Sequence, residues 1–60
     1  MIENDKIVYF INLAIENLEA IKTCFERDGF VAKSYVAEKA NKAMTYVEFI
    51  LNLLEAEENE

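Results

Sequence analysis

The sequence predicts an all-α protein: an antiparallel two-helix hairpin that dimerises into a four-helix bundle. In each half of the chain, apolar residues recur at alternating spacings of four and three, as in coiled coils. There is no proline, and the single glycine, Gly29, stands near mid-chain, where a turn would fall. The hydrophobic content of 53% is more than 60 residues in one hairpin can bury.

The first helix is expected over residues 5–28, with Asn4 or Asp5 capping its start. A strand is the alternative for its apolar beginning, but a strand would alternate every two residues. The spacing of 4, 3, 4, 3, 4 instead matches the a and d positions of a coiled coil. These positions are Ile7, Ile11, Ala14, Leu18, Ile21 and Phe25.

Gly29 is expected just past the end of this helix, in the left-handed conformation that glycine tolerates. Phe30 would then pack back on Phe25, a contact typical of such helix ends. A connection over residues 29–33 is short enough to place the two helices antiparallel.

The second helix is expected over residues 34–57, capped by Ser34, although Val31 is an alternative start. The acidic residues 55–60 lie at the unfavourable end of the helix dipole, so this tail is expected to fray. Residues 1–60 form one domain without a linker. The same spacing returns in this helix at Val36, Ala40, Ala43, Val47, Ile50 and Leu54.

The a and d residues of the two helices form one stripe on each helix. These stripes pair if the numbers of facing residues sum to 61, and large residues then face small ones in the middle pairs. The e positions of both helices would line one side of this pair, and all but Lys22 are apolar. A hairpin alone leaves that side uncovered, and a twofold dimer is the commonest solution. The predicted dimer interface is therefore Val8, Ile15, Ala37, Met44 and Leu51.

A second apolar group is expected on the other side, away from the turn. It is rich in aromatic side chains, which often anchor protein interfaces. It is either peripheral core of the bundle or a docking site for another protein. The candidate partner patch is Tyr9, Phe10, Leu13, Tyr46, Phe49 and Leu53.

The charges are unevenly distributed. The net charge is −6, yet five basic side chains near the turn outnumber three acidic ones, Glu26, Asp28 and Glu38. Ordinary surface pairs explain such a cluster, for example Glu38 with Lys42, four residues apart. The alternative is a basic tip that touches nucleic acid or an acidic partner: Lys22, Arg27, Lys33, Lys39 and Lys42.

The arrangement of two long helices and one turn resembles the Rop-type hairpin dimer, a plasmid regulator that binds paired RNA loops. The resemblance is architectural and spans both helices, and no motif residues match. It implies a nucleic-acid-binding regulator that would use the basic tip. The negative net charge counts against nucleic acid, since phosphate binding usually needs clustered cations.

No catalytic, cofactor or metal site is expected. The chain has no histidine, the commonest general base, and its one thiol, Cys24, has no base placed to activate it. A lone cysteine forms no internal disulfide, and zinc usually needs several Cys or His ligands. A di-iron bundle needs inward-facing Glu with Glu-x-x-His, which is absent.

We therefore expect a non-enzymatic protein that pairs with itself and binds another protein as an adaptor, regulator or inhibitor. By analogy, small acidic proteins of phages and mobile elements act this way. A nucleic-acid-binding regulator and a small subunit of a larger helical assembly are the alternatives. The lone thiol and the absence of a long apolar run favour a cytoplasmic location without a membrane anchor.

Overall fold

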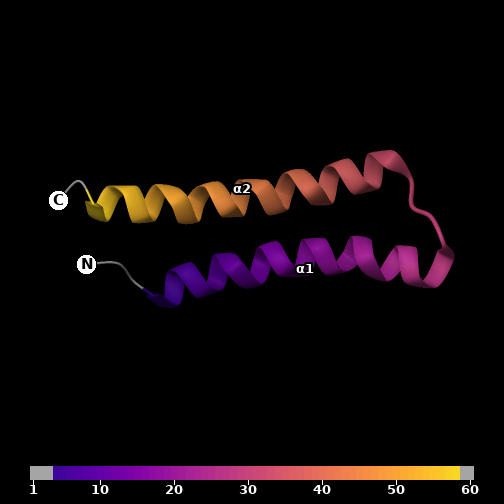
Figure 1. Ribbon diagram of the computed structural model, residues 1–60, viewed down its shortest axis with the longest axis horizontal. Coiled ribbons are helices and arrows are strands. Elements are labelled where there is room, and N and C mark those ends of the chain that lie inside the picture. The colour runs from indigo at the N-terminus through magenta and orange to yellow at the C-terminus, as the bar shows by residue number, and fades with distance from the viewer. Residues whose placement is uncertain (1–3, 59–60) are drawn as a thin grey trace.

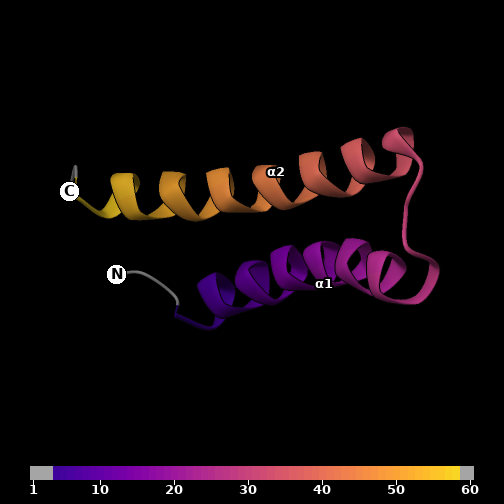
Figure 2. The ribbon, with the colours of Figure 1, turned by 45° about the vertical axis from the view of Figure 1, so that its right-hand side comes forward.

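A computed structural model describes residues 4–58, which form a hairpin of two long helices (Figure 1). Helix α1 spans Asn4–Asp28 and helix α2 spans Lys33–Glu58. The helices pack side by side and run in opposite directions, as Figures 1 and 2 both show. The predicted hairpin is confirmed, and the predicted bounds of 5–28 and 34–57 differ by at most one residue at each end.

Gly29 ends α1 as expected. Its φ of 81° lies in the left-handed region, and its N–H donates to the carbonyl of Phe25 at 3.1 Å. Phe30, however, is 73% exposed, so it does not fold back to cover Phe25 as the sequence predicts. One backbone hydrogen bond satisfies the helix end without the hydrophobic contact.

Helix α2 begins after Ala32, whose carbonyl accepts hydrogen bonds from the N–H groups of Tyr35 and Val36 at 3.0 and 3.1 Å. Ala32 therefore occupies the N-cap position, and the predicted cap, Ser34, lies inside the first turn. Alanine offers no side-chain oxygen to the free N–H groups there. At the other end, residues 55–58 of the acidic tail are helical, and residues 59–60 lie outside the described part.

The hairpin is a single layer, with Cα extents of 47 × 18 × 10 Å. Within residues 4–58, only Ala14 and Ala43 are buried, at 8% and 5% exposure, and no large side chain is fully buried. Stable domains usually consist of at least two packed layers around a core. This hairpin supplies one layer, with small side chains where the helices approach each other.

The helices meet along a line that differs from the predicted stripes. The residues of α1 that are least exposed to solvent begin at Ile7 and follow spacings of 3, 4, 3, 4, 3. The least exposed residues of α2 follow the same spacings from Val36. Each helix is therefore rotated about its own axis relative to the predicted packing. This rotation turns about half of the predicted a and d residues outward. These outward residues, expected between the helices, are Ile11, Leu18, Phe25, Val47 and Leu54.

Candidate protein-interaction surfaces

The rotation leaves an apolar surface along both helices, here called the apolar face. Its residues keep between 41% and 56% of their surface exposed. They alternate by three and four along each helix, so they share one side of it, and both helices turn this side the same way. The members are Val8, Ile11, Ile15, Leu18, Phe25, Met44, Val47, Leu51 and Leu54.

All five predicted dimer-interface residues lie on this side of the hairpin, and all five are exposed. The predicted interface is narrower than the face, because the spacing predicts Ile11, Leu18, Val47 and Leu54 in the contact between helices. A hollow of about 410 Å³ runs along it, where Ala40 and Ala43 are small. Leu18 from α1 and Met44 and Val47 from α2 border this hollow, so both helices build the surface.

Four aromatic rings, here called the aromatic cluster, gather towards the terminal end: Tyr9, Phe10, Tyr46 and Phe49. Phe10 is central, with ring centroids 5.6 Å from Tyr9, 6.1 Å from Tyr46 and 5.4 Å from Phe49. The Phe10 and Tyr46 rings stack at 23° across the two helices, whereas Tyr46 and Phe49 meet edge to face at 70°. Such pairs each stabilise by about 0.5–1.5 kcal/mol beyond their buried area.

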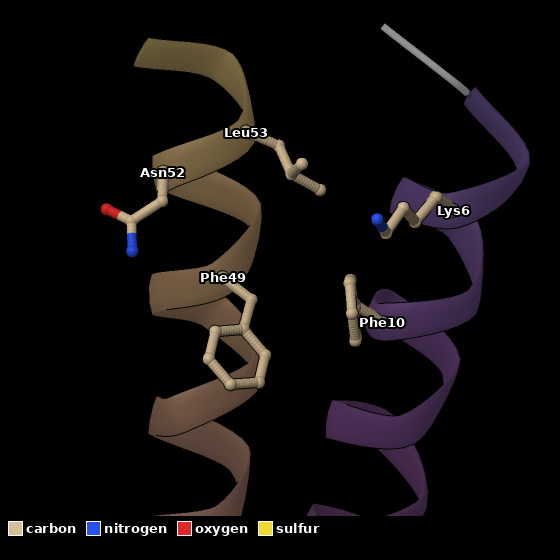
Figure 3. A pocket seen from close by; sticks show the side chains of 5 residues that line it. All are labelled: Lys6, Phe10, Phe49, Asn52 and Leu53. Carbon is tan, nitrogen blue, oxygen red and sulfur yellow. The ribbon is translucent and has the colours of Figure 1, made fainter. Parts of the chain in front are cut away.

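The aromatic cluster borders a shallow hollow of about 350 Å³ (Figure 3). Figure 3 shows Phe10 and Lys6 on α1 opposite Phe49 and Leu53 on α2, with the side chain of Asn52 at the edge. The floor is apolar, and one cationic and one amide group stand at the rim. This hollow is separate from the one on the apolar face, with which it shares no lining residue.

The predicted partner patch is divided by the structure. Phe10, Leu13, Tyr46 and Leu53 are half-buried between the helices. Tyr9 and Phe49 remain 59% and 43% exposed. The patch is therefore partly the hairpin's own packing, and only its outer rings are available to another molecule.

The basic tip is a set of side chains with local partners as well as exposed ones. The Lys39 ammonium lies over the Tyr35 ring, 5.5 Å from its centroid, and the Lys42 ammonium is 3.5 Å from the Glu38 carboxylate. Lys22, Arg27 and Lys33 are exposed.

Cys24 is half-buried near the turn and borders a hollow of about 410 Å³ with Phe30, Val31 and Tyr35. Desolvation raises the pKa of the Tyr35 hydroxyl above its ordinary value of 10.0, and the neighbouring Cys24 thiol and Glu38 carboxylate add to this. Within residues 4–58, no group of three or more Cys, Asp or Glu side chains is arranged to hold a metal ion.

In the described part of the chain, neither helix combines the length and apolarity needed to cross a bilayer. Comparisons with family models, curated proteins and solved structures give no match for this chain. What the protein does must therefore be inferred from its own surfaces.

Proposed function

We propose that this chain is a non-enzymatic, cytoplasmic adaptor, regulator or inhibitor. It dimerises through its apolar face into a four-helix bundle and binds another protein through the exposed rings of the aromatic cluster. The observation that supports this most directly is that alanines are its only buried residues within 4–58. Twelve of its large hydrophobic side chains in that range are exposed and therefore available to partners.

The apolar face is the larger surface and fits a helical partner. Its nine large side chains are spaced as a and d residues are, and burying them contributes roughly 25 cal/mol per Å². A hairpin of this size gains only a few kcal/mol from its own core. Covering this face with a second copy would add a stabilisation of similar size.

The aromatic cluster supports a second, separate contact. Tyr9 and Phe49 lie on the opposite side of the helices from the apolar face, so a bundle formed through that face leaves them exposed. Exposed aromatic side chains are typical anchors of protein interfaces, and Phe49 also lines the hollow. The acidic residues Glu16, Glu48 and Glu55 are exposed as well and would attract a basic partner surface.

Binding of nucleic acid through the basic tip is less well supported. Lys39 and Lys42 are engaged with Tyr35 and Glu38, and the net charge of −6 opposes approach to phosphates. A salt-dependent shift with RNA or DNA would favour that alternative. A poorly folded monomer in isolation would favour a subunit of a larger helical assembly.

The experiment that tests partner binding compares Tyr9→Ser/Phe49→Ser with Phe30→Ser. The control removes an aromatic ring that is 73% exposed at the turn, away from the aromatic cluster. Each tagged protein is used to capture partners from the native host, with identification by mass spectrometry. The double variant should stay dimeric and lose the partner that wild type and Phe30→Ser both capture.

If the double variant unfolds, the two rings belong to the core and the docking proposal is wrong. If it remains folded and still captures the same partner, the binding site lies elsewhere. The basic tip then becomes the next surface to change, at Lys22 and Lys33.

A further inference from the structure

We infer that the occupant of the apolar face is a second copy in antiparallel orientation, with the turn of each copy over the terminal end of the other. In this arrangement α1 packs against α1, and α2 against α2, of the partner. The inference rests on the proposed dimer and adds its orientation and register. Four observations support it: the exposed area, the spacing, the side-chain sizes and the charges.

The exposed area matches what one additional copy would cover. The accessible surface of the hairpin is 4783 Å². A compact monomer of 6.9 kDa exposes about 4,000 Å² by the usual scaling of surface with mass. The excess of about 800 Å² equals the area that each partner typically buries in a specific interface.

The spacing on the apolar face is that of helix-to-helix packing. On α1 the face follows 3, 4, 3, 4, 3 spacing from Val8 to Phe25, interrupted only by Lys22. On α2 it follows the same spacing from Ala37 to Leu54. Each helix thus carries a second a/d stripe in addition to the one that contacts its neighbour in the hairpin, as helices of a four-helix bundle do.

Side-chain sizes distinguish two possible twofold arrangements, since residue i contacts j and j contacts i in either. In the antiparallel dimer, facing residues of α2 have numbers that sum to 91. A large side chain then meets a small one in two of three layers. The α2 layers are Ala37 with Leu54, Ala40 with Leu51, and Met44 with Val47.

The α1 stripes pair when the numbers of facing residues sum to 33, and the layers are then Val8 with Phe25, Ile11 with Lys22, and Ile15 with Leu18. The centres of the two sets fall between residues 16 and 17 and between 45 and 46. Phe10 contacts both Tyr46 and Phe49, so side-by-side residues of the hairpin have numbers that sum to about 56–59, whereas the two centres sum to 62 and are offset by roughly 4.5–9 Å. One twofold axis therefore holds only one of the two registers, and the register that we propose is that of α2.

The alternative dimer, with both turns at the same end, distributes volume unevenly. It pairs α1 with the partner's α2 at a sum of 62. Val8 then meets Leu54 and Ile11 meets Leu51 at the terminal end, whereas Phe25 meets Ala37 near the turn. Large side chains would accumulate at one end of the bundle, and the two layers would splay apart there.

The charges favour the antiparallel dimer as well. Residues 22–42 carry five basic and three acidic side chains. Residues 4–16 and 46–58 together carry six acidic side chains and only Lys6 as a cation. Antiparallel packing brings each basic turn end over an acidic terminal end, and the sum of 91 places Lys33 opposite Glu58. Packing with the turns together would place like charges against each other.

The orientation is tested by attaching one spin label per chain at Lys33→Cys in a Cys24→Ala background and measuring the distance between labels. Antiparallel dimers should give a distance of about 36 Å, the length of a 24-residue helix. Dimers with their turns together should give about 20 Å or less, since packed helices lie 8–10 Å apart. Glu16→Cys in the same background is the matched control. Its label sits near the middle of α1, so it should give a short distance in either dimer.

A second variant checks the register. With cysteines at both Ala37 and Leu54, the antiparallel dimer should form a covalent dimer on mild oxidation, because these positions face each other between copies. The two positions are 17 residues apart on one helix, too far for a bond within one chain. A long label distance together with the covalent dimer supports the inference.

A short distance from the Lys33→Cys label at dimeric mass would overturn the antiparallel orientation and leave the proposed dimer intact. Monomeric mass, with no distance between labels, would overturn the dimer as well. Failure to capture a host protein bears on the aromatic cluster alone, because the distance measurement uses the purified chain.

Discussion

Replacing Met44 with glutamate tests whether a partner covers the apolar face. Met44 is 56% exposed in the hairpin, so a single hairpin in water tolerates a charge there. Fully burying a methionine contributes about 1.5–3 kcal/mol, so covering the exposed half contributes roughly 1–1.5 kcal/mol per copy. Each dimer carries the change twice. The lost burial alone therefore amounts to about 2–3 kcal/mol.

Glutamate also adds the cost of removing a carboxylate from water without a partner, which is several kcal/mol when burial is complete. A total of about 3 kcal/mol or more corresponds to at least a hundredfold weaker dimer. If the proposed dimer stabilises the hairpin, helicity at micromolar concentration should fall together with mass. Sedimentation and circular dichroism across a concentration series measure both.

Thr45→Glu is the matched control, with the same new charge one residue further along α2. Thr45 is exposed and points away from the apolar face, so the change should cost at most about 0.5 kcal/mol. The reasoning is refuted if Met44→Glu retains the mass and melting curve of Thr45→Glu. Met44 would then face solvent in the assembled protein.

Three smaller predictions concern the turn and the beginning of α2. Ala32→Ser supplies the missing cap and should stabilise the protein by about 1 kcal/mol, seen as a higher melting temperature. Gly29→Ala forces a side chain into the left-handed region at φ 81° and should destabilise it by about 1–2 kcal/mol in urea unfolding; an unchanged midpoint would contradict this. The raised pKa of Tyr35 favours its neutral form in the fold, so stability present below about pH 10 should be lost as pH rises through the folded pKa. Tyr35→Phe should therefore lose less stability in alkaline titrations than wild type, and equal losses would argue against a desolvated hydroxyl.

The sequence predicts the hairpin because its signals are local. Helix spacing, a single glycine and the absence of proline locate both helices to within a residue. The capping of α2 was predicted wrongly, because the chain turns into the helix at Ala32 rather than at Ser34, the residue with the better capping side chain. Phe30 was also predicted wrongly, since one backbone hydrogen bond ends α1 without its contact.

The line of contact between the helices could not be predicted from spacing alone. Two apolar stripes overlap on each helix, and in α1 they share Ile7, Ala14 and Ile21. The hydrophobic pattern favours the stripe through Ile11 and Leu18, whereas the structure uses the one containing Phe10, Asn17 and Cys24.

The stripe that forms the contact between the helices contains two polar residues, which make it look less apolar in the sequence. The Asn17 side-chain amide donates to the Leu13 carbonyl at 2.8 Å, so it lies half-buried without needing a partner on the other helix. Lys39 lies along the contact with its ammonium over the Tyr35 ring. Stacking of Phe10 on Tyr46 across the helices favours this stripe, and spacing within one helix carries no information about such a pair.

The two buried alanines have a consequence for how much of this protein is active at a given level of synthesis. Ala14 and Ala43 contribute so little burial that, for the proposed dimer, folding and association should be one event, second order in chain concentration. The folded fraction then rises with the amount of protein made, and dilute chains remain open to proteases. A protein that folds only as the proposed dimer would respond to its own abundance, because its apolar face would be covered only above a threshold concentration.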